Sequence, residues 1–146
     1  MNYTYRIMGE SDIAKIVPLY IEQYNTFEDA CWTEETVTRR IQQVITRQDS
    51  FSLLMEQGDS PVGFAMGYFE QYDDLFAYDL IEIVIAHAHQ GKGLGTALMQ
   101  ELERQIKSMG AGLIQLQSVK DARHEHFYGK LGFGTAANLV LKTKPL

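Results

Sequence analysis

The sequence predicts an α/β fold of the α+β type, a sandwich in which helices cover a mixed sheet. Two patterns support this prediction. Apolar residues recur at helical spacing before residue 49 and again over residues 93–109, whereas much of the stretch between them is rich in β-branched and aromatic residues. The predicted order is strand, two helices, three strands, helix, strand, helix and strand.

The first half of the chain contains a short strand at residues 3–8 and two helices. Ser11 is the expected N-cap of the first helix, with Asp12 beside the positive end of the helix dipole. Thr33 is the expected N-cap of the second helix, in which Val37 and Ile41 face inward. Both helices are therefore expected to pack an apolar stripe against the sheet.

Three consecutive antiparallel strands follow, because turn-forming sequences separate three runs of β-branched and aromatic residues. These runs are residues 51–56, 62–72 and 77–85. The helix at residues 93–109 ends at Gly110. The last predicted elements are a strand at residues 113–119, a short helix at residues 122–131, and a strand or hairpin at residues 133–142.

Composition narrows the possible functions of the chain. Its 146 residues suit a single domain spanning residues 1–146, and its one cysteine excludes an internal disulfide. The net charge is −6 and no block of Lys and Arg exists, which argues against binding to nucleic acid or an anionic membrane. No apolar run approaches a membrane span and no secretion signal is visible, so the expected location is the cytoplasm. The oligomeric state stays open, a homodimer included.

The most informative motif is a glycine-rich stretch that follows the strand at residues 77–85. Its residues are Gln90, Gly91, Lys92, Gly93, Leu94, Gly95 and Thr96. It opens a strongly amphipathic helix, whose first N–H groups have no partners within the helix. Glycine also lets the backbone approach a ligand closely, so the stretch predicts a site for phosphate or pyrophosphate. The alternative is a plain strand-to-helix turn.

Two common phosphate motifs do not fit this stretch. The residue after Lys92 is glycine rather than Ser or Thr, and Thr96 stands where the dinucleotide motif needs its third glycine. The pattern that fits is Q/R-x-x-G-x-G/A. A second motif, FYGKLGF at residues 127–133, follows after the next strand. With both motifs the chain resembles the GNAT superfamily of N-acetyltransferases over nearly its whole length.

The resemblance implies a GNAT-like acyl-CoA N-acyltransferase fold, with a central, mostly antiparallel sheet, helices on both faces and a splay between strands four and five. It implies acetyl-CoA as co-substrate, with its pyrophosphate on the backbone amides of the glycine-rich stretch. Main-chain groups of the preceding strand would pair with the pantetheine arm, and these belong to Ile83, Val84 and Ile85. Asp121 falls at a pantetheine-contacting position where many relatives have Asn, and its negative charge argues against that contact.

Glu82 is the candidate general base. It interrupts a strand that is otherwise apolar, and burying a carboxylate without a partner is costly. Glu82 must therefore face a polar cleft or a cation. The resemblance implies that it deprotonates the amine through a water molecule, whereas the alternative is a structural pair with Arg or Lys.

Tyr128 is the candidate general acid. A phenol has an ordinary pKa of about 10 and could protonate a thiolate, whose ordinary pKa is about 8.5. The alternative is that Phe127 and Tyr128 anchor the last helix in the core. The resemblance implies a catalytic tyrosine at position 128 and an oxyanion donor on the strand before the glycine-rich stretch, such as the N–H of Val84.

The predicted function is transfer of an acetyl group from acetyl-CoA to the primary amine of a small-molecule or peptide acceptor. The alternative is a non-catalytic acyl-CoA-binding or regulatory module, which would need neither Glu82 nor Tyr128. No metal site is expected, because His124 and His126 are two residues apart and face different ways on a helix. A group of acids would suit a cationic amine: Glu28, Asp29, Asp73, Asp74 and Asp79.

Overall fold

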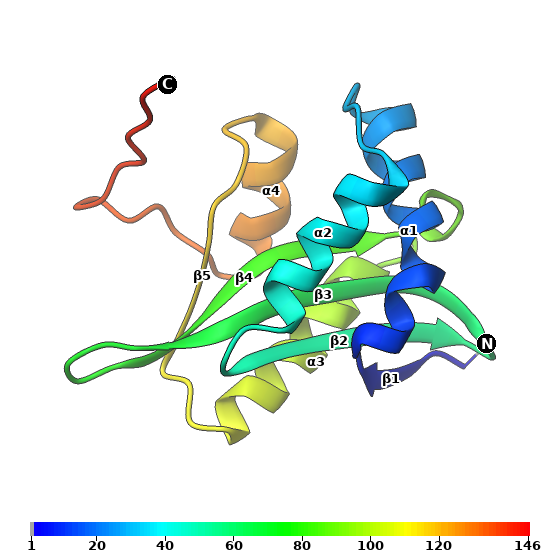
Figure 1. The fold of residues 1–146 in the computed structure, drawn as a ribbon. Helices are drawn as coiled ribbons and strands as arrows, with labels where there is room; N and C mark the ends of the chain where they lie inside the picture. The colour runs from blue at the N-terminus through cyan, green and yellow to red at the C-terminus, as the bar shows by residue number, and fades with distance from the viewer. Residues whose placement is uncertain (1) are drawn as a thin grey trace.

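The core of the protein is a five-stranded sheet in which spatial order follows chain order. A computed structural model describes residues 2–146. The strands are β1 (Thr4–Ile7), β2 (Ser50–Gln57), β3 (Ser60–Gln71), β4 (Phe76–Ile85) and β5 (Leu113–Leu116). The pairs from β1 to β4 are antiparallel, and β5 runs parallel to β4 (Figure 1). The prediction of a mostly antiparallel sheet is confirmed.

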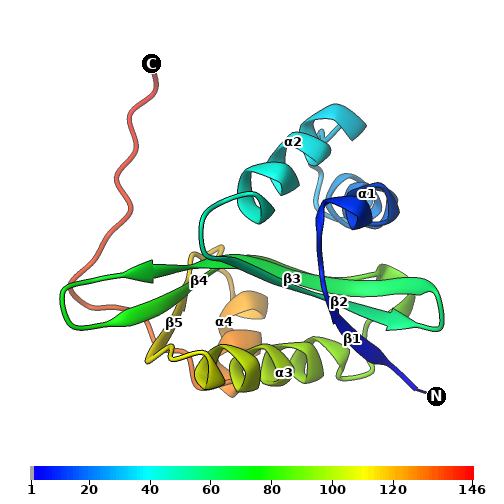
Figure 2. The same cartoon turned by 60° about the horizontal axis from the view of Figure 1, so that its bottom comes forward.

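Helices cover both faces of this sheet, as predicted. Helices α1 (Ile13–Ile21) and α2 (Glu34–Ile45) lie on one face, and α3 (Leu94–Ser108) and α4 (Ala122–Lys130) lie on the other (Figure 2). Each face has its own apolar core, because alternate strand residues point to opposite sides. Thr33 caps α2 as predicted, since its side chain accepts a hydrogen bond from the Thr36 N–H at 3.1 Å.

The start of α1 differs from the prediction. A 3-10 turn, η1 (Glu10–Asp12), precedes the helix, and Ser11 is not its N-cap. Asp12 is instead buried, with 3% of its surface exposed. Its carboxylate accepts hydrogen bonds from the Arg6 guanidinium at 2.8 and 3.1 Å and from the Gly9 N–H at 2.9 Å. Arg6 also donates to Glu56 at 3.1 Å, so this ion pair network ties β1 to β2 and to the start of α1.

The end of α1 is also irregular. The helix continues through Pro18 into a π-helical turn, η2 (Glu22–Thr26). Single π-turns within helices frequently occur at functional sites. This one brings Gln23 and Tyr24 to the end of β4, where they line the cavity described below.

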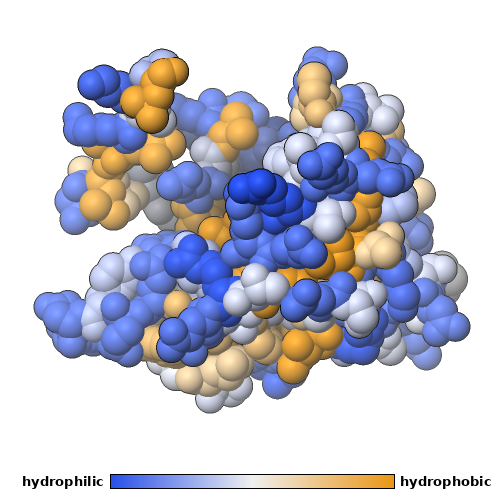
Figure 3. All heavy atoms as spheres, in the orientation of Figure 1, coloured by the Kyte–Doolittle hydropathy of each residue, from blue (hydrophilic) through white to orange (hydrophobic). Residues whose placement is uncertain are grey.

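The predicted strand or hairpin at residues 133–142 is wrong. Residues 133–146 form no strand, and beyond Phe133 the segment is exposed and stands away from the body of the molecule (Figures 1 and 3). Leu139, Val140 and Leu141 are 66%, 77% and 72% exposed. Their composition suits a strand, but strand formation requires a paired neighbour, and no pairing partner lies beside them.

A β-bulge in β4 sets the direction of its last side chains. Met66 of β3 pairs with Glu82, but the next residue, Gly67, pairs with Leu80, so Ile81 is the extra residue. Leu80 packs in the core under α3, whereas Val84 packs in the core under α1 and α2. The bulge therefore turns Glu82 toward the α1–α2 face together with Val84.

Pairing between β4 and β5 stops early. The register joins Ala77 to Leu113 and ends where Leu80 meets Leu116, so β5 is shorter than the predicted strand at residues 113–119. Residues 81–85 continue β4 without a neighbour on that side. This is the predicted splay between strands four and five. No helix formed by residues 2–146 combines the length and apolar character that crossing a membrane requires.

The Asp12 network yields a prediction about stability. The Arg6 hydrogen bonds hold the pKa of Asp12 below its usual value, so the stabilisation is present above about pH 4 and is lost as the pH falls through the lower pKa of the folded state. Asp12→Asn should lower the free energy of unfolding at pH 7 by about 1–2 kcal/mol. The gap between variant and wild type should narrow below about pH 4. Urea unfolding across this pH range measures both effects.

The control is Asp59→Asn, because Asp59 is an exposed acid in the β2–β3 turn. That variant should unfold like the wild type at every pH. A gap between Asp12→Asn and wild type that stays constant down to pH 3 would contradict the assignment.

Candidate active site

The glycine-rich stretch forms an open loop in front of α3. The chain leaves β4, makes the short turn η3 (His87–His89), and enters α3 after Gly93. Gly91 and Gly93 have φ angles of +78° and +77°, a left-handed conformation that favours glycine. A Cβ atom placed on either residue would meet no atom within 4 Å, so the loop faces open space.

The N-terminus of α3 lacks a cap. Gly93 is the N-cap residue, and no side chain of residues 2–146 accepts a hydrogen bond from the first-turn N–H groups. These groups and the positive end of the helix dipole point toward the open space in front of the loop. These features are those of an anion-binding helix start, and phosphate binding at this loop stays a prediction.

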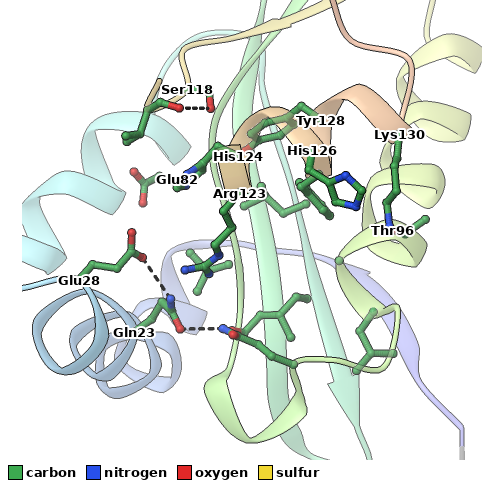
Figure 4. A pocket seen from close by; sticks show the side chains of 18 of the residues that line it. Gln23, Glu28, Glu82, Thr96, Ser118, Arg123, His124, His126, Tyr128 and Lys130 are labelled. Carbon is green, nitrogen blue, oxygen red and sulfur yellow. Dashed lines mark hydrogen bonds between the residues drawn. The ribbon is translucent and has the colours of Figure 1, made fainter. Parts of the chain in front are cut away.

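The side chain of Gln90 holds the loop in place from inside. Its Nε2 donates to the carbonyl oxygen of Ile85 at 2.9 Å and to Oε1 of Gln23 at 2.7 Å. Gln23 in turn donates to Glu28 at 3.1 Å (Figure 4). Gln90 thus links the end of β4 to η2, and its side chain is occupied by protein partners.

The splay between β4 and β5 opens into a cavity of about 570 Å³. Residues 81–85 form one wall and residues 117–119 form another. The start of α3, one face of α4 and residues of and after the η2 turn also contribute to the lining (Figure 4). Most of the predicted site residues line it together. They are Glu82, Ile83, Val84, Ile85, Gln90, Gly91, Gly93, Leu94, Gly95, Thr96 and Tyr128.

Two of the predicted cofactor-binding residues do not line this cavity, namely Lys92 and Asp121. Asp121 is the N-cap of α4, where its carboxylate accepts hydrogen bonds from the backbone N–H and the ring Nδ1 of His124, both at 2.8 Å. This capping holds the pKa of Asp121 below its usual value. His124 itself lines the cavity.

Glu82 lies in the wall of the cavity. It faces both a polar cleft and a cation, the two environments that the sequence left as alternatives. Its side chain is 13% exposed, and its Oε1 lies 3.4 Å from Nη2 of Arg40 on α2. Its Oε2 is buried and has no hydrogen-bond partner among residues 2–146. Glu82 therefore has a cation on one side and an unpartnered oxygen that could accept a proton or a hydrogen bond from a ligand.

Three tyrosines surround this carboxylate. Burial, and next the negative charge of Glu82, raise the pKa of Tyr20, Tyr24 and Tyr128 above the usual value for a phenol. All three are therefore protonated at neutral pH. Tyr24 and Tyr128 line the cavity, so each presents a neutral phenol to it.

Tyr128 also packs against aromatic neighbours. Its ring meets Phe127 and Phe133 edge to face, with centroid separations of 5.1 and 5.6 Å. It contacts the core under α3 and still lines the cavity. The two interpretations of this residue, aromatic anchor and acid, are therefore compatible.

The fold and this cavity can be compared with known proteins. A sequence model of the acetyltransferase (GNAT) family matches residues 14–133. The chain belongs to this family. An uncharacterized N-acetyltransferase of Methanocaldococcus jannaschii is 24% identical over an alignment of 137 residues, which covers 90% of this GNAT chain and 61% of that protein. The chain thus spans less than two thirds of the length of this curated relative.

Solved structures share the GNAT fold at low sequence identity. A possible acetyltransferase from Clostridium difficile 630 matches with a TM-score of 0.85 at 12% identity, over 100% of this chain and 99% of that chain. An aminoglycoside N-acetyltransferase in complex with CoA matches with a TM-score of 0.77 at 12% identity, over 99% and 96% of the two chains. The GNAT fold implied by the two sequence motifs is confirmed.

Several residues that line the cavity of this GNAT chain were not predicted from the sequence. Gln23 and Tyr24 lie in the π-turn, and the spacing of apolar residues in the sequence did not predict this turn. Arg123 and Lys130 lie on α4, four residues before and three residues after Phe127. Helical spacing from the aromatic motif could have identified this second pair.

The acids proposed for a cationic acceptor are dispersed. Glu28 is the only member of that group that lines the cavity among the described residues. Asp79 lies on β4 and accepts a hydrogen bond from Gln115 at 2.7 Å. Burial, followed by its contact with Glu70, raises the pKa of Asp79 to about 6. Within residues 2–146, no group of three or more His, Cys, Asp and Glu residues could hold a metal ion.

Proposed function

We propose that the chain transfers an acetyl group from acetyl-CoA to a primary amine of a small-molecule or peptide acceptor. One observation supports this most strongly: a single cavity joins the free edge of β4, the uncapped start of α3, and the pair Glu82 and Tyr128. Acetyl-CoA would supply the acyl group as a thioester. The likeness to a family member in complex with CoA supports this choice of donor.

The protein groups that would hold the donor are mostly backbone groups. The amides of residues 91–96 suit the pyrophosphate, because they combine open space with unpaired N–H donors. The free edge at Ile83, Val84 and Ile85 suits the amide groups of the pantetheine arm, which can pair with it as an added strand would. The side chain of Lys92 and the residue Asp121 have no such support, because neither Lys92 nor Asp121 lines the cavity.

Glu82 is proposed as the base. A primary amine is protonated at neutral pH and must lose a proton before it attacks a carbonyl carbon. Glu82 lies beside Arg40, and its unpartnered oxygen can take that proton directly or through a water molecule. Glu28, in the same cavity, adds negative charge that favours a cationic amine.

Tyr128 is proposed as the general acid, which donates a hydrogen bond to the departing sulfur. The raised pKa keeps the phenol protonated over the whole physiological pH range, so the hydroxyl hydrogen is always available for donation. The departing thiolate has an ordinary pKa of about 8.5, below that of the phenol. Tyr128 therefore acts mainly through a hydrogen bond that strengthens as negative charge develops on sulfur, while the N–H of Val84 would stabilise the oxyanion.

The first test of this function concerns the loop. Gly93→Asp should raise the Kd for CoA by about tenfold or more, because it places a negative charge in front of the α3 N-terminus. Gly58→Asp is the matched control. Gly58 also has a positive φ, +60°, and open space around it, but it lies in the β2–β3 turn. Isothermal calorimetry with CoA measures both variants. Equal affinities in wild type and a folded Gly93→Asp variant would remove the loop from the site.

The second test concerns Tyr128. Tyr128→Phe should lower kcat by about 10²-fold and leave the Kd for acetyl-CoA almost unchanged. In the wild type, burial and Glu82 raise the pKa of Tyr128, so kcat should show no loss from phenol ionisation below about pH 10. Tyr5→Phe on β1 is the control and should keep full activity, since Tyr5 does not line the cavity. Wild-type turnover in Tyr128→Phe would make Tyr128 a packing residue.

The third test concerns Glu82. Glu82→Gln keeps the shape and removes the basicity, so kcat/KM for the amine should fall, and the loss should shrink at high pH where free amine is abundant. If Glu82 instead binds the cationic amine, KM should rise while kcat stays nearly constant. Glu125→Gln, an exposed change on α4 outside the cavity lining, is the control. Superimposable pH–rate profiles of Glu82→Gln and wild type would exclude both roles.

The acceptor itself requires a screen. Primary amines of different classes, including amino acids, polyamines, aminoglycosides and short peptides, would be offered with acetyl-CoA while release of free thiol is followed. Tight CoA binding without turnover for any of these acceptors would favour a non-catalytic acyl-CoA-binding module over an enzyme.

A further inference from the structure

The proposed base is held by a cation from a different element. Nη2 of Arg40 lies 3.4 Å from Oε1 of Glu82, and this is the only salt bridge that Glu82 forms with residues 2–146. The Glu82 side chain lies next to α2, the helix that carries Arg40 (Figure 4). The two residues are 42 positions apart in the sequence, so the pair forms only in the folded protein.

The packing of α2 fixes the position of Arg40. Val37 precedes it by three residues and Ile41 follows it directly, and both of these side chains are fully buried against the sheet. Arg40 therefore lies at the margin of the apolar face of α2. Its side chain is 39% exposed, so the guanidinium group reaches Glu82 from the edge of this core.

Tyr20 provides a firmly packed surface beside the ion pair. It is 1% exposed, and its ring lies 4.6 Å from the ring of Tyr24 and 6.2 Å from that of Phe64, measured between centroids. Burial raises the pKa of Tyr20 most; the charge of Glu82 adds to this rise and the charge of Arg40 opposes it. Both charged groups thus lie close to the Tyr20 hydroxyl, which limits the positions that they can take.

The ion pair gives the two carboxylate oxygens of Glu82 different surroundings. Oε1 contacts Arg40, whereas Oε2 has no hydrogen-bond partner among residues 2–146. The last torsion of a glutamate side chain is broad, so a carboxylate without a partner samples many orientations. A charge-assisted contact to one oxygen restricts this torsion and keeps the other oxygen in place. Such restriction matters, because a displacement of about 1 Å can lower a reaction rate by about 10²-fold.

Arg40 also changes how Glu82 attracts an acceptor. A carboxylate alone binds a protonated amine as an ion pair. This interaction stabilises the bound acceptor without stabilising the transition state, because the amine must lose its proton before it attacks. A positive charge beside the carboxylate opposes the attraction. The pair with Arg40 therefore favours proton transfer over tight binding of the cation.

We propose that Arg40 is a positioning residue for the transfer reaction. It holds Oε1 of Glu82 so that Oε2 is the oxygen presented to the amine, and it weakens the ion pair between Glu82 and a protonated acceptor. Arg40 acts through Glu82, because Glu82 lines the cavity and Arg40 does not. This inference rests on the proposed function, in which Glu82 is the base.

The first test is Arg40→Gln, which removes the charge and keeps a polar side chain. With one good cationic acceptor, kcat should fall by about tenfold, because the carboxylate loses its fixed orientation. KM for that acceptor should stay constant or fall, because an opposing charge has been removed. The Kd for acetyl-CoA should not change. Steady-state kinetics and isothermal calorimetry measure these quantities, and circular dichroism verifies folding. An unchanged kcat, or a loss that lies wholly in a higher KM, would overturn the inference.

A double-mutant cycle tests whether Arg40 acts through Glu82. The effects of two independent residues add, whereas those of residues that act together do not. Arg40→Gln should therefore have almost no further effect on kcat in the Glu82→Gln background. A loss in the cycle that is equal in both backgrounds would overturn the inference, because a purely structural role of Arg40 gives that result. Arg40→Met, which keeps the apolar stem, replaces Arg40→Gln in the cycle if the latter does not fold.

The matched control is Arg39→Gln. Arg39 precedes Arg40 on α2, is exposed, and forms no salt bridge with residues 2–146. This variant should keep the kcat and KM of the wild type. Equal losses in Arg39→Gln and Arg40→Gln would show a general effect on α2 and overturn the inference. Wild-type kinetics in Glu82→Gln would overturn the proposed base itself. A large loss in Glu82→Gln with none in Arg40→Gln would overturn only the role of Arg40.

Discussion

The separation of β4 from β5 is the constraint on which the site depends. Backbone N–H and C=O groups at a strand edge need partners, and sheets usually provide them through the next strand. Here the parallel pairing stops at Leu80 and Leu116, and residues 81–85 continue without a neighbour. A hydrogen-bonding edge is thereby left inside a cavity instead of on the outer surface. An extended ligand with amide groups can complete the sheet at this point.

Two further features make this edge chemically useful. The bulge at Ile81 turns Glu82 toward α1 and α2, where Arg40 provides a cation and the buried Tyr20 interacts with the carboxylate. In a regular strand with the same residues and no bulge, strict alternation would place residue 82 in the core under α3, on the same face as Leu80. The uncapped start of α3 lies at the other end of the same edge, so an acid–base site and an anion site face one cavity.

Much of the fold was predictable because local signals agreed with one another. Thr33 capped its helix, the glycine-rich stretch marked the transition from β4 to α3, and the three central strands followed from composition. The failures have physical causes. Ser11 resembles a cap, but the ion pair between Arg6 and Asp12, residues on two different elements, determines the local conformation. The segment around Val140 has strand composition, yet strand formation depends on a partner that composition cannot reveal.

The candidate site was predictable in part for the same reason. Backbone-dominated features, such as the loop at Gly93, leave a sequence motif, and so does Glu82 in an apolar strand. Side chains that reach the site from distant elements leave no sequence motif. Arg40 and Gln23, for example, come close to the end of β4 only in the tertiary fold. Asp121 illustrates the reverse case, since its position in the motif suggested a ligand contact while its carboxylate caps a helix.

The hydrogen-bonded link between Gln23 and Gln90 has a consequence for how such a protein can change over time. The side-chain amide of Gln90 joins the loop in front of α3 to the η2 turn by a hydrogen bond to Gln23. The amide of Gln23 in turn donates a hydrogen bond to Glu28. A substitution in that turn, selected for a new acceptor, would also disturb the loop. Substitutions in the η2 turn and in the loop before α3 should therefore depend on each other. A laboratory evolution experiment that varies position 23 should also vary position 90.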